Sequence, residues 1–461
     1  MAMIGKQVPQ GPDMSAPARR VVVKLRRPPQ TAAAAEALGR DTVLQSLARS
    51  LPGVSVRPYF EDVRPPSIAT PRGAEAAPEG QSVFHSFAVI DVPPGTDPVA
   101  LARSVGERAD VEIACVEGGP TPPPVNPGNN PLAYNQGYLV AAPDGIDALW
   151  AWGSTDGTGV GFVDLERGWT LDHEDLAAAN ISVISGLNQD YTGHGTAVLG
   201  EVLGVDNDLG IVGIAPAVTA RVVSQWRTAS NYQTAAAILS AIGAMRAGDV
   251  LLLEAQTTYS TVSGYLPVEV EEAVYDAIRA ATDAGIIVIE AGGNGGIDLD
   301  TFQDTNGRQI LNRASADFRD SGAILVGAGG AFAPHGRLSF SNFGSRIDCY
   351  AWGEDIQTTG DGWTGNASNS YTAQFGGTSG ATPIVTGAAI LLQSWARAQE
   401  KDYSPKDIRA LLADAALNTP SADPAVDRIG VMPDLRAIIE RETQRLRVAA
   451  TAPALADAGK A

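Results

Sequence analysis

The chain of 461 residues contains only two cysteines, Cys115 and Cys349, which lie far apart in the sequence. A disulfide framework requires more cysteines, and a cysteine-ligated zinc site requires cysteines at short spacings. The sequence therefore argues against both kinds of site, and we expect the two thiols to be structural.

Long apolar runs are also missing. No run approaches the roughly 18 residues that a membrane-spanning helix requires. Residues 1–20 are polar and rich in Pro, Gly and Gln. They lack the apolar core of about 7–15 residues that a secretory signal needs. We therefore expect a cytoplasmic protein without membrane contact.

Basic residues are scarce, with 33 Lys and Arg against 52 Asp and Glu and a formal net charge of −19. Nucleic-acid binding requires clustered Lys and Arg, so this balance argues against a nucleic-acid partner. The negative charge instead favours solubility and basic substrates. Hydrophobic residues make up 44% of the chain and charged residues 18%, which is typical of a globular protein.

The N-terminal part has the pattern of a small α+β domain. Residues 1–20 are expected to form a flexible tail, and residues 21–117 to alternate as strand, helix, two strands, helix and strand. The expected helices begin at Asp41, whose helix carries apolar residues between 43 and 51, and at Asp97. Residues 118–134 contain many prolines, which favour an extended, semi-rigid linker between domains.

From residue 135 to residue 448 the pattern changes to alternating strands and helices, with an Ala-rich tail expected at 449–461. This alternation predicts an α/β domain, a parallel sheet covered by helices on both faces. The expected strands are 160–163, 220–223, 250–253, 286–289 and 323–326. Functional residues of such a sheet lie at the carboxyl ends of its strands.

Ser379 lies where a glycine-rich loop, Gly376-Gly377-Thr378, enters an apolar helix. The free N–H groups and the dipole at a helix N-terminus favour negative charge. A serine hydroxyl there can attack a carbonyl while a neighbouring N–H stabilises the oxyanion. An ordinary serine N-cap is the alternative interpretation.

Three further residues make the catalytic interpretation stronger. Asp164 follows a short apolar strand, His194 lies in a Gly-His-Gly-Thr turn, and Asn294 lies in a Gly-Gly-Asn-Gly-Gly turn directly after another strand. The chain contains only four histidines. The order Asp, His, Ser is one of the orders known for hydrolase triads.

These motifs, with Gly-Ile-Ala-Pro at 213–216 and Ser-Phe-Ser-Asn-Phe-Gly at 339–344, resemble those of the subtilisin-like serine proteases, or subtilases. The resemblance covers about residues 135–434. It implies a hydrolase, a serine endopeptidase that acts on protein or peptide substrates without a catalytic cofactor. The N-terminal domain, 21–117, is similar in position and topology to the family's propeptide, and would be an intramolecular partner of the catalytic domain.

The resemblance assigns a role to each residue of the catalytic triad and the oxyanion hole. Ser379 would be the nucleophile, with His194 acting first as base and then as acid. Asp164 would hold the imidazole tautomer. The Asn294 amide and the Ser379 backbone N–H would form the oxyanion hole.

The sequence departs from the family around the acid. Residues 165–169, Leu-Glu-Arg-Gly-Trp, stand where the family has Ser or Thr followed by Gly. A His-Glu-Asp-Leu segment begins at His173, slightly later than the family's His-Pro-Asp-Leu. Asp172 is therefore a rival for the acid, although it lacks the preceding strand of Asp164.

The resemblance also implies a structural calcium ion. Residues 205–211 align without gaps onto the family's calcium loop, and oxygen ligands of this kind suit Ca²⁺. An acidic solvated loop would have the same composition. The implied ligands are Asp175, the Asn207 side chain, the backbone carbonyls of Val205, Leu209 and Ile211, and Gln136.

Alignment of the strand at 250–253 with the family places Glu254, Ala255 and Gln256 beside the pocket for the substrate residue that precedes the cut. Gly293 is a further expected substrate-binding residue. A carboxylate there would favour Arg or Lys. A Glu254 side chain turned toward solvent or another residue is the alternative. Two other functions also remain open: a peptide macrocyclase or transpeptidase on the same scaffold, and a catalytically silent peptide-binding module.

Overall fold

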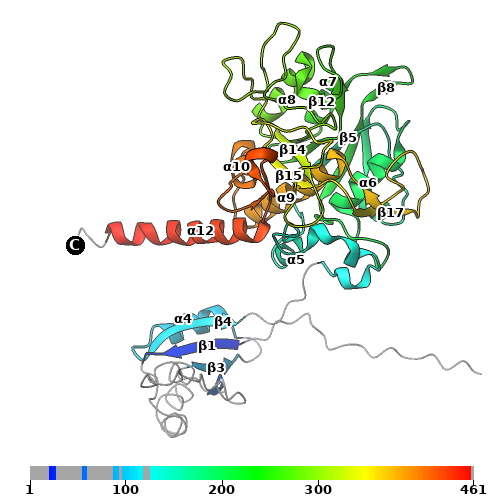
Figure 1. Cartoon of the computed structure of the whole chain (residues 1–461). Helices are drawn as coiled ribbons and strands as arrows, with labels where there is room; N and C mark the ends of the chain where they lie inside the picture. Colours follow the sequence, from blue (N-terminus) through cyan, green and yellow to red (C-terminus); the bar gives the residue numbers. More distant parts are fainter. Residues whose placement is uncertain (1–19, 27–53, 60–86, 93–95, 118–124, 458–461) are drawn as a thin grey trace, which may run out of the picture. The chain divides into compact units, whose positions relative to one another are not determined.

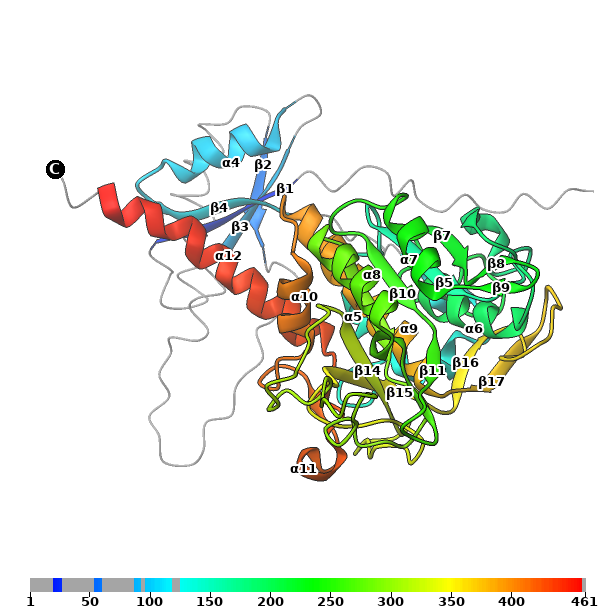
Figure 2. The ribbon, with the colours of Figure 1, turned by 90° about the horizontal axis from the view of Figure 1, so that it is seen from above.

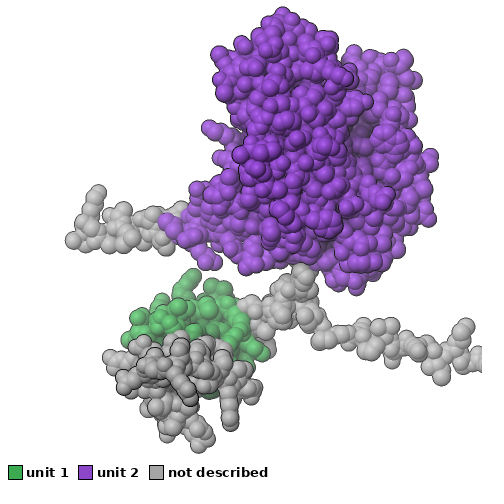
Figure 3. Space-filling view, in the orientation of Figure 1, with its two compact units in different colours: residues 1–122 green, residues 123–461 purple. Residues whose placement is uncertain are grey.

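The computed structural model describes residues 20–26, 54–59, 87–92, 96–117 and 125–457, with side chains up to residue 448. The chain forms two compact units, residues 1–122 and 123–461, which are coloured separately in Figure 3. The division lies inside the predicted linker. The predicted tail at 1–20, apart from Arg20, and the predicted helix over 43–51 lie outside the described residues.

The first unit contains a four-stranded antiparallel sheet of order β2-β3-β1-β4 and one described helix. Asp97 caps this helix, because its carboxylate accepts a hydrogen bond from the Val99 N–H at 2.9 Å. Buried Val21 and Val23 of the first strand pack with Leu101 and Val105 of the helix. The elements are β1 (Arg20–Leu25), β2 (Ser55–Pro58), β3 (Phe87–Asp91), α4 (Pro98–Gly106) and β4 (Val111–Glu117).

The second unit is built on a nine-stranded sheet of order β18-β19-β15-β14-β13-β10-β5-β7-β6. All neighbours are parallel except β18 and β19. The strands are β5 (Gly161–Glu166), β6 (Ser182–Ser185), β7 (Thr219–Ser224), β10 (Val250–Leu253), β13 (Ile287–Ala291), β14 (Ile324–Gly329), β15 (Cys349–Trp352), β18 (Thr419–Pro420) and β19 (Val431–Met432).

Helices cover both faces of this sheet, as Figure 1 and Figure 2 show. Apolar residues of α6 (Thr192–Leu203) and α9 (Thr378–Ala398) pack in one core with Phe162 and Leu252. Those of α7 (Thr234–Ile242) and α8 (Glu272–Asp283) pack in another with Leu165 and Leu253. The predicted α/β fold, a parallel sheet between helices, is confirmed.

Shorter elements complete the second unit. The helices are α5 (Ala148–Ala151), α10 (Pro405–Leu412), α11 (Pro424–Asp427) and α12 (Leu435–Asp457). Three small antiparallel pairs join β8 (Trp226–Thr228) to β9 (Asn231–Tyr232), β11 (Gln256–Thr258) to β12 (Tyr265–Pro267), and β16 (Ile356–Thr359) to β17 (Tyr371–Phe375).

Two predicted boundaries differ from the structure. Residues 125–134 were expected to be linker, but Val125 and Ala133 are buried in the main core of the second unit. The predicted tail at 449–461 begins inside α12, which continues to Asp457. Alanine has the highest helix propensity, so the Ala-rich segment extends the preceding helix.

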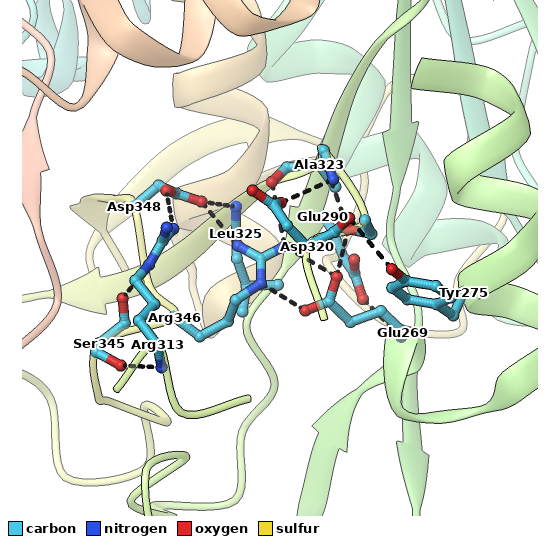
Figure 4. A network of polar contacts seen from close by, with 12 residues as sticks. Glu269, Tyr275, Glu290, Arg313, Asp320, Ala323, Leu325, Ser345, Arg346 and Asp348 are labelled. Carbon is cyan, nitrogen blue, oxygen red and sulfur yellow. Dashed lines mark hydrogen bonds and ion pairs between the residues drawn. The ribbon is translucent and has the colours of Figure 1, made fainter. Parts of the chain in front are cut away.

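Arg346 is fully buried and lies at the centre of the polar network shown in Figure 4. Its guanidinium donates to Glu269 at 2.6 and 2.9 Å and to Asp348 at 2.8 Å. Asp348 also accepts hydrogen bonds from Arg313 and Arg409, each at 2.8 Å. The network therefore ties the segment before α8 to α10 and to the end of the sheet that carries β14 and β15.

Replacement of this arginine is expected to destabilise the second unit strongly. Arg346→Met would remove the ion pair of the buried Glu269 carboxylate and one of the three arginines that bind Asp348, which costs about 3–5 kcal/mol. Arg279→Met is the matched control, because Arg279 forms an exposed i,i+4 pair with Asp283 and such pairs contribute about 0–1 kcal/mol. Urea unfolding followed by tryptophan fluorescence measures both; equal losses in the two variants would contradict this role.

Candidate active site

The acidic side of the site comes from β5. Along this strand Phe162, Asp164 and Glu166 alternate with Val163 and Leu165, which are buried in the core beneath α7 and α8. Successive side chains of a strand point to opposite faces. Asp164 and Glu166 therefore both project toward the face that carries α6 and α9, and Glu166 lies at the carboxyl end of the strand.

His194 lies in the first turn of α6, and its Nδ1 forms a short hydrogen bond with the Glu166 carboxylate. The backbone N–H of His194 donates to the Trp363 carbonyl at 2.8 Å. The imidazole ring packs edge-on against Phe375, with ring centroids 5.4 Å apart. The ring is thus fixed on two sides, and its Nε2 is left for chemistry.

The charge of Glu166 controls the basicity of this imidazole. Burial favours the neutral ring, but attraction and hydrogen bonding to Glu166 outweigh it, so the pKa of His194 is raised above its usual value. Arg167 acts in the opposite direction through its positive charge. A carboxylate that raises the pKa of a histidine makes it a better base and stabilises its protonated form.

Asp164, which was expected to hold His194, has a different partner. It is fully buried, and its Oδ2 accepts a hydrogen bond from the Trp169 indole N–H at 2.6 Å. Burial, together with the negative charge of Glu166, raises the pKa of Asp164 well above its usual range. The expectation placed the end of the strand at Asp164, whereas β5 continues for two more residues and brings Glu166 to the histidine. Asp172, the rival, is exposed and is not among the residues that line the cleft.

Ser379 is the second residue of α9, a helix that begins directly after the Gly376-Gly377 turn. Gly377, at the N-cap, has φ +83°, which glycine adopts without strain. The serine is partly exposed and lines the same cleft as His194. Among the hydrogen bonds of the described residues there is none between the Ser379 hydroxyl and His194.

Asn294 follows β13 and is anchored to the start of α9. Its Oδ1 accepts hydrogen bonds from the Thr378 backbone N–H at 2.8 Å and from the Thr378 hydroxyl at 3.2 Å. Its Nδ2 donates to the Gln256 Oε1 at 3.2 Å. The hydrogen bonds to the Oδ1 therefore hold the Asn294 side chain in place. Its Nδ2 points to Gln256, which lines the cleft, and a substrate oxygen could take the place of the Gln256 Oε1.

The cleft has a volume of about 360 Å³. The predicted pocket residues Glu254, Ala255 and Gln256 all line it. Gly293 instead has φ +90° and packs so closely on Asn342 that a Cβ would lie 2.8 Å from its Nδ2. The other lining residues are Glu166, Arg167, Tyr191, His194, Gln225, Tyr232, Tyr265, Ala291, Trp363, Thr378 and Ser379.

The predicted calcium ligands either lie in the loop at 205–211 or form hydrogen bonds with residues in it or directly after it. Asp175 is buried; its Oδ2 accepts from the Ile211 N–H at 2.8 Å, while its Oδ1 has no hydrogen-bond partner among the described residues. The Asn207 Oδ1 accepts from the Leu209 N–H at 3.0 Å, and the Gln136 Oε1 accepts from the Val212 N–H at 3.0 Å. The unpaired buried oxygen of Asp175 fits a cation site, because buried carboxylates otherwise require a partner.

Two other kinds of feature are missing from the part of the chain that the structure describes. Within it, no three His, Cys, Asp or Glu side chains gather as a metal-binding group. None of the helices in these same residues is long and apolar enough to span a membrane.

Sequence reasoning missed Glu166 and Arg167 as residues of the site. The signal for Glu166 was its spacing of two from Asp164 on one strand, which puts both on the same face. Arg167 stacks over the Tyr191 ring at 4.5 Å and over the Tyr232 ring at 5.7 Å. No local motif predicts this contact, because Tyr232 is far from Arg167 in the sequence.

Comparisons with known proteins show the family and the fold. A family profile described as the subtilase family matches residues 173–431, a span that begins after Glu166. An intracellular serine protease of Paenibacillus polymyxa is 30% identical over 286 residues, covering 59% of this chain and 78% of the relative. Subtilisin Savinase of Lederbergia lenta is 30% identical over 254 residues, covering 54% and 82%.

A solved structure of a protease from Pseudoalteromonas arctica has the same fold. It is 22% identical, with a TM-score of 0.51, and the match covers 68% of this chain and 99% of that chain.

Proposed function

The chain belongs to the subtilase family of serine proteases, and from this premise we propose that it is an endopeptidase whose triad is Ser379, His194 and Glu166. The observation that carries the proposal is the hydrogen bond between the His194 Nδ1 and the Glu166 carboxylate, in the cleft that Ser379 lines. Glu166 thus takes the role that the family pattern had assigned to Asp164.

In the proposed reaction, the Ser379 Oγ attacks the peptide carbonyl carbon and its proton passes to the His194 Nε2. The Glu166 carboxylate keeps the imidazole in the tautomer that accepts at Nε2 and stabilises the imidazolium. His194 then gives the proton to the leaving amine. In the second half of the reaction a water molecule attacks the acyl carbon, His194 takes its proton, and His194 passes that proton to the Ser379 Oγ as the acid product leaves.

The oxyanion would be bound by the Asn294 amide and the Ser379 backbone N–H. Anchoring of the Asn294 carbonyl by Thr378 supports this role, because it leaves the amide as the donor. Substrate would displace the Gln256 carbonyl from the amide on binding.

The test is incubation of the full chain with a linear peptide that contains many different bonds, followed by mass spectrometry of the products. Hydrolysis adds one water to each pair of fragments, whereas a macrocyclase or transpeptidase releases a joined product without added water. A peptide left intact, with no labelling of Ser379 by a fluorophosphonate, would indicate a silent binding module instead.

The first unit, including residues 21–117, is proposed to be a propeptide-like domain and an intramolecular partner of the catalytic unit. Its antiparallel sheet with a helix and its position ahead of the catalytic unit support this assignment. A chain lacking residues 1–122 would then refold more slowly than the full chain and regain the full rate when the first unit is added separately.

A structural calcium ion is part of the proposal. The Asp175 Oδ1 and the Asn207 side chain, together with the backbone carbonyls of Val205, Leu209 and Ile211, would hold it through oxygen atoms only. Gln136 can contribute only the second lone pair of its Oε1, because the first accepts the Val212 N–H. The ion would supply positive charge at the buried Asp175 and take no part in the reaction.

Removal of calcium is expected to lower the thermal unfolding midpoint of the second unit, and addition of calcium to restore it. Calcium at about 100 times its dissociation constant would stabilise the fold by about 2.7 kcal/mol. Asp175→Asn should abolish this response, whereas Asp283→Asn, an exposed change on α8, should preserve it. A midpoint that is unchanged by chelator and calcium in the unsubstituted chain would refute the site.

A further inference from the structure

Glu254 is a buried carboxyl group of the cleft that the proposed triad does not use. It follows β10, and its backbone N–H donates to the Leu165 carbonyl of β5 at 3.2 Å. The residue is only 6% exposed, and neither carboxylate oxygen has a hydrogen-bond partner among the described residues. Buried polar groups are normally paired, so an unpaired carboxyl next to a nucleophile calls for an explanation.

The surroundings of Glu254 oppose its ionisation. Burial is the largest cause of its raised pKa, and the negative charges of Glu166, Asp164 and Glu201 add to it. The Ser379 hydroxyl acts in the opposite direction on this pKa, because it can hydrogen-bond to the ionised carboxylate.

Positive charge near this carboxyl is already engaged. Arg167 lies 3.6 Å from the Asp190 carboxylate and stacks on Tyr191. The titratable and charged residues that face the cleft or act on Glu254 come from β5, α6, β9, β12 and the residues next to β5 and α6. They are Asp164, Glu166, Arg167, Tyr191, His194, Glu201, Tyr232 and Tyr265.

The position of the nucleophile supplies the second observation. Ser379 and Glu254 line one cleft with His194, yet no hydrogen bond joins the Ser379 hydroxyl to His194 among the described residues. A serine hydroxyl has one proton to donate. The Ser379 hydroxyl can donate this proton to His194 or to Glu254, and only donation to His194 prepares the oxygen for attack.

We propose that Glu254 is a positioning residue that must be protonated for catalysis, because its ionised form would take the hydrogen bond of the Ser379 hydroxyl away from His194. The inference rests on the proposed function. With Glu254 neutral, the hydroxyl turns to the His194 Nε2, the Oγ–carbon bond forms, and the proton passes to His194 while Glu254 keeps its own.

Ionisation of Glu254 acts against the reaction in a second way. A negative carboxylate in a site with little water repels the negative charge that develops on the substrate oxygen. Activity therefore exists below the pKa of Glu254 and is lost as the pH rises through it. The acid side of the profile belongs to His194, which must be neutral to act as base and whose pKa is raised.

The test compares the pH profile of kcat/KM for the full chain with that of Glu254→Gln, using a peptide without Arg or Lys. The unsubstituted enzyme should lose activity by about tenfold per pH unit on the alkaline side. Glu254→Gln cannot ionise, so its alkaline decline should disappear or move to higher pH while the acid side stays in place. The rate of fluorophosphonate reaction with Ser379 should follow the same profile.

Two further variants make the result decisive. Glu254→Leu is also neutral and should flatten the alkaline side in the same way, which covers the case of a poorly folded glutamine variant. Glu201→Gln removes another buried, unpaired carboxyl, on α6 outside the cleft lining, and should leave a tenfold decline per pH unit.

An alkaline decline that is unchanged in both Glu254 variants overturns the inference. So does a loss of activity in Glu254→Gln that is confined to substrates with Arg or Lys before the cut, because Glu254 would then be a specificity carboxylate. Absence of hydrolysis and of Ser379 labelling at every pH would refute the proposed function itself.

Discussion

Ser379→Ala should lower kcat by about 10⁶ and abolish fluorophosphonate labelling, while the thermal unfolding midpoint stays close to that of the unsubstituted chain. The change removes the nucleophile, so the acyl intermediate can no longer form. It costs little stability, because Ser379 is partly exposed and its hydroxyl makes no hydrogen bond with His194 among the described residues.

The double variant Ser379→Ala with His194→Ala supplies the control. Nucleophile and base act as one unit, so the second change should add little to the loss caused by the first. Multiplied losses in the double variant would mean that the two residues act independently, and the assignment of the triad would fail.

Glu166→Gln should lower kcat by about 10⁴, with KM little changed. An amide in place of the carboxylate can hydrogen-bond to the His194 Nδ1 but no longer fixes the productive tautomer or stabilises the imidazolium. Kinetics with a peptide substrate measure the loss. The pKa of His194 should fall at the same time, because Glu166 is what raises it.

Asp164→Asn is the matched comparison, since both residues lie on the same face of β5. An asparagine can still accept the hydrogen bond of the Trp169 indole, and burial together with the charge of Glu166 already raises the pKa of Asp164. The loss in kcat should therefore stay within about tenfold, well short of the loss expected when the group on the imidazole is changed. A loss of about 10⁴ in Asp164→Asn, with a small one in Glu166→Gln, would restore the original assignment.

The position at which β5 ends explains why the sequence suggested Asp164 as the acid of the triad. The apolar run at 160–163 is followed by an aspartate, and the family pattern places its acid at such a point. The pattern does not show where β5 ends. In the structure β5 pairs with β10 on one side and β7 on the other, and Leu165 and Glu166 belong to the strand. Pairing to both neighbours extends the strand and carries Glu166 to His194.

The sequence by itself determined the family, the α/β fold and the enzyme class. Local motifs were enough for this, because the glycines around Ser379, His194 and Asn294 fix backbone turns that depend on nearby residues only. The alternation of apolar runs was also enough to predict a parallel sheet between helices.

Only the tertiary structure decided which carboxylate touches the histidine and which one lies beside the serine. Glu166, Asp164 and Glu254 come from the ends of two neighbouring strands, and their different partners follow from strand length and pairing. Glu254 is buried and has no hydrogen-bond partner among the described residues, and its burial arises from contacts between segments far apart in the chain. Such contacts set the electrostatics of a site, and a linear pattern does not record them.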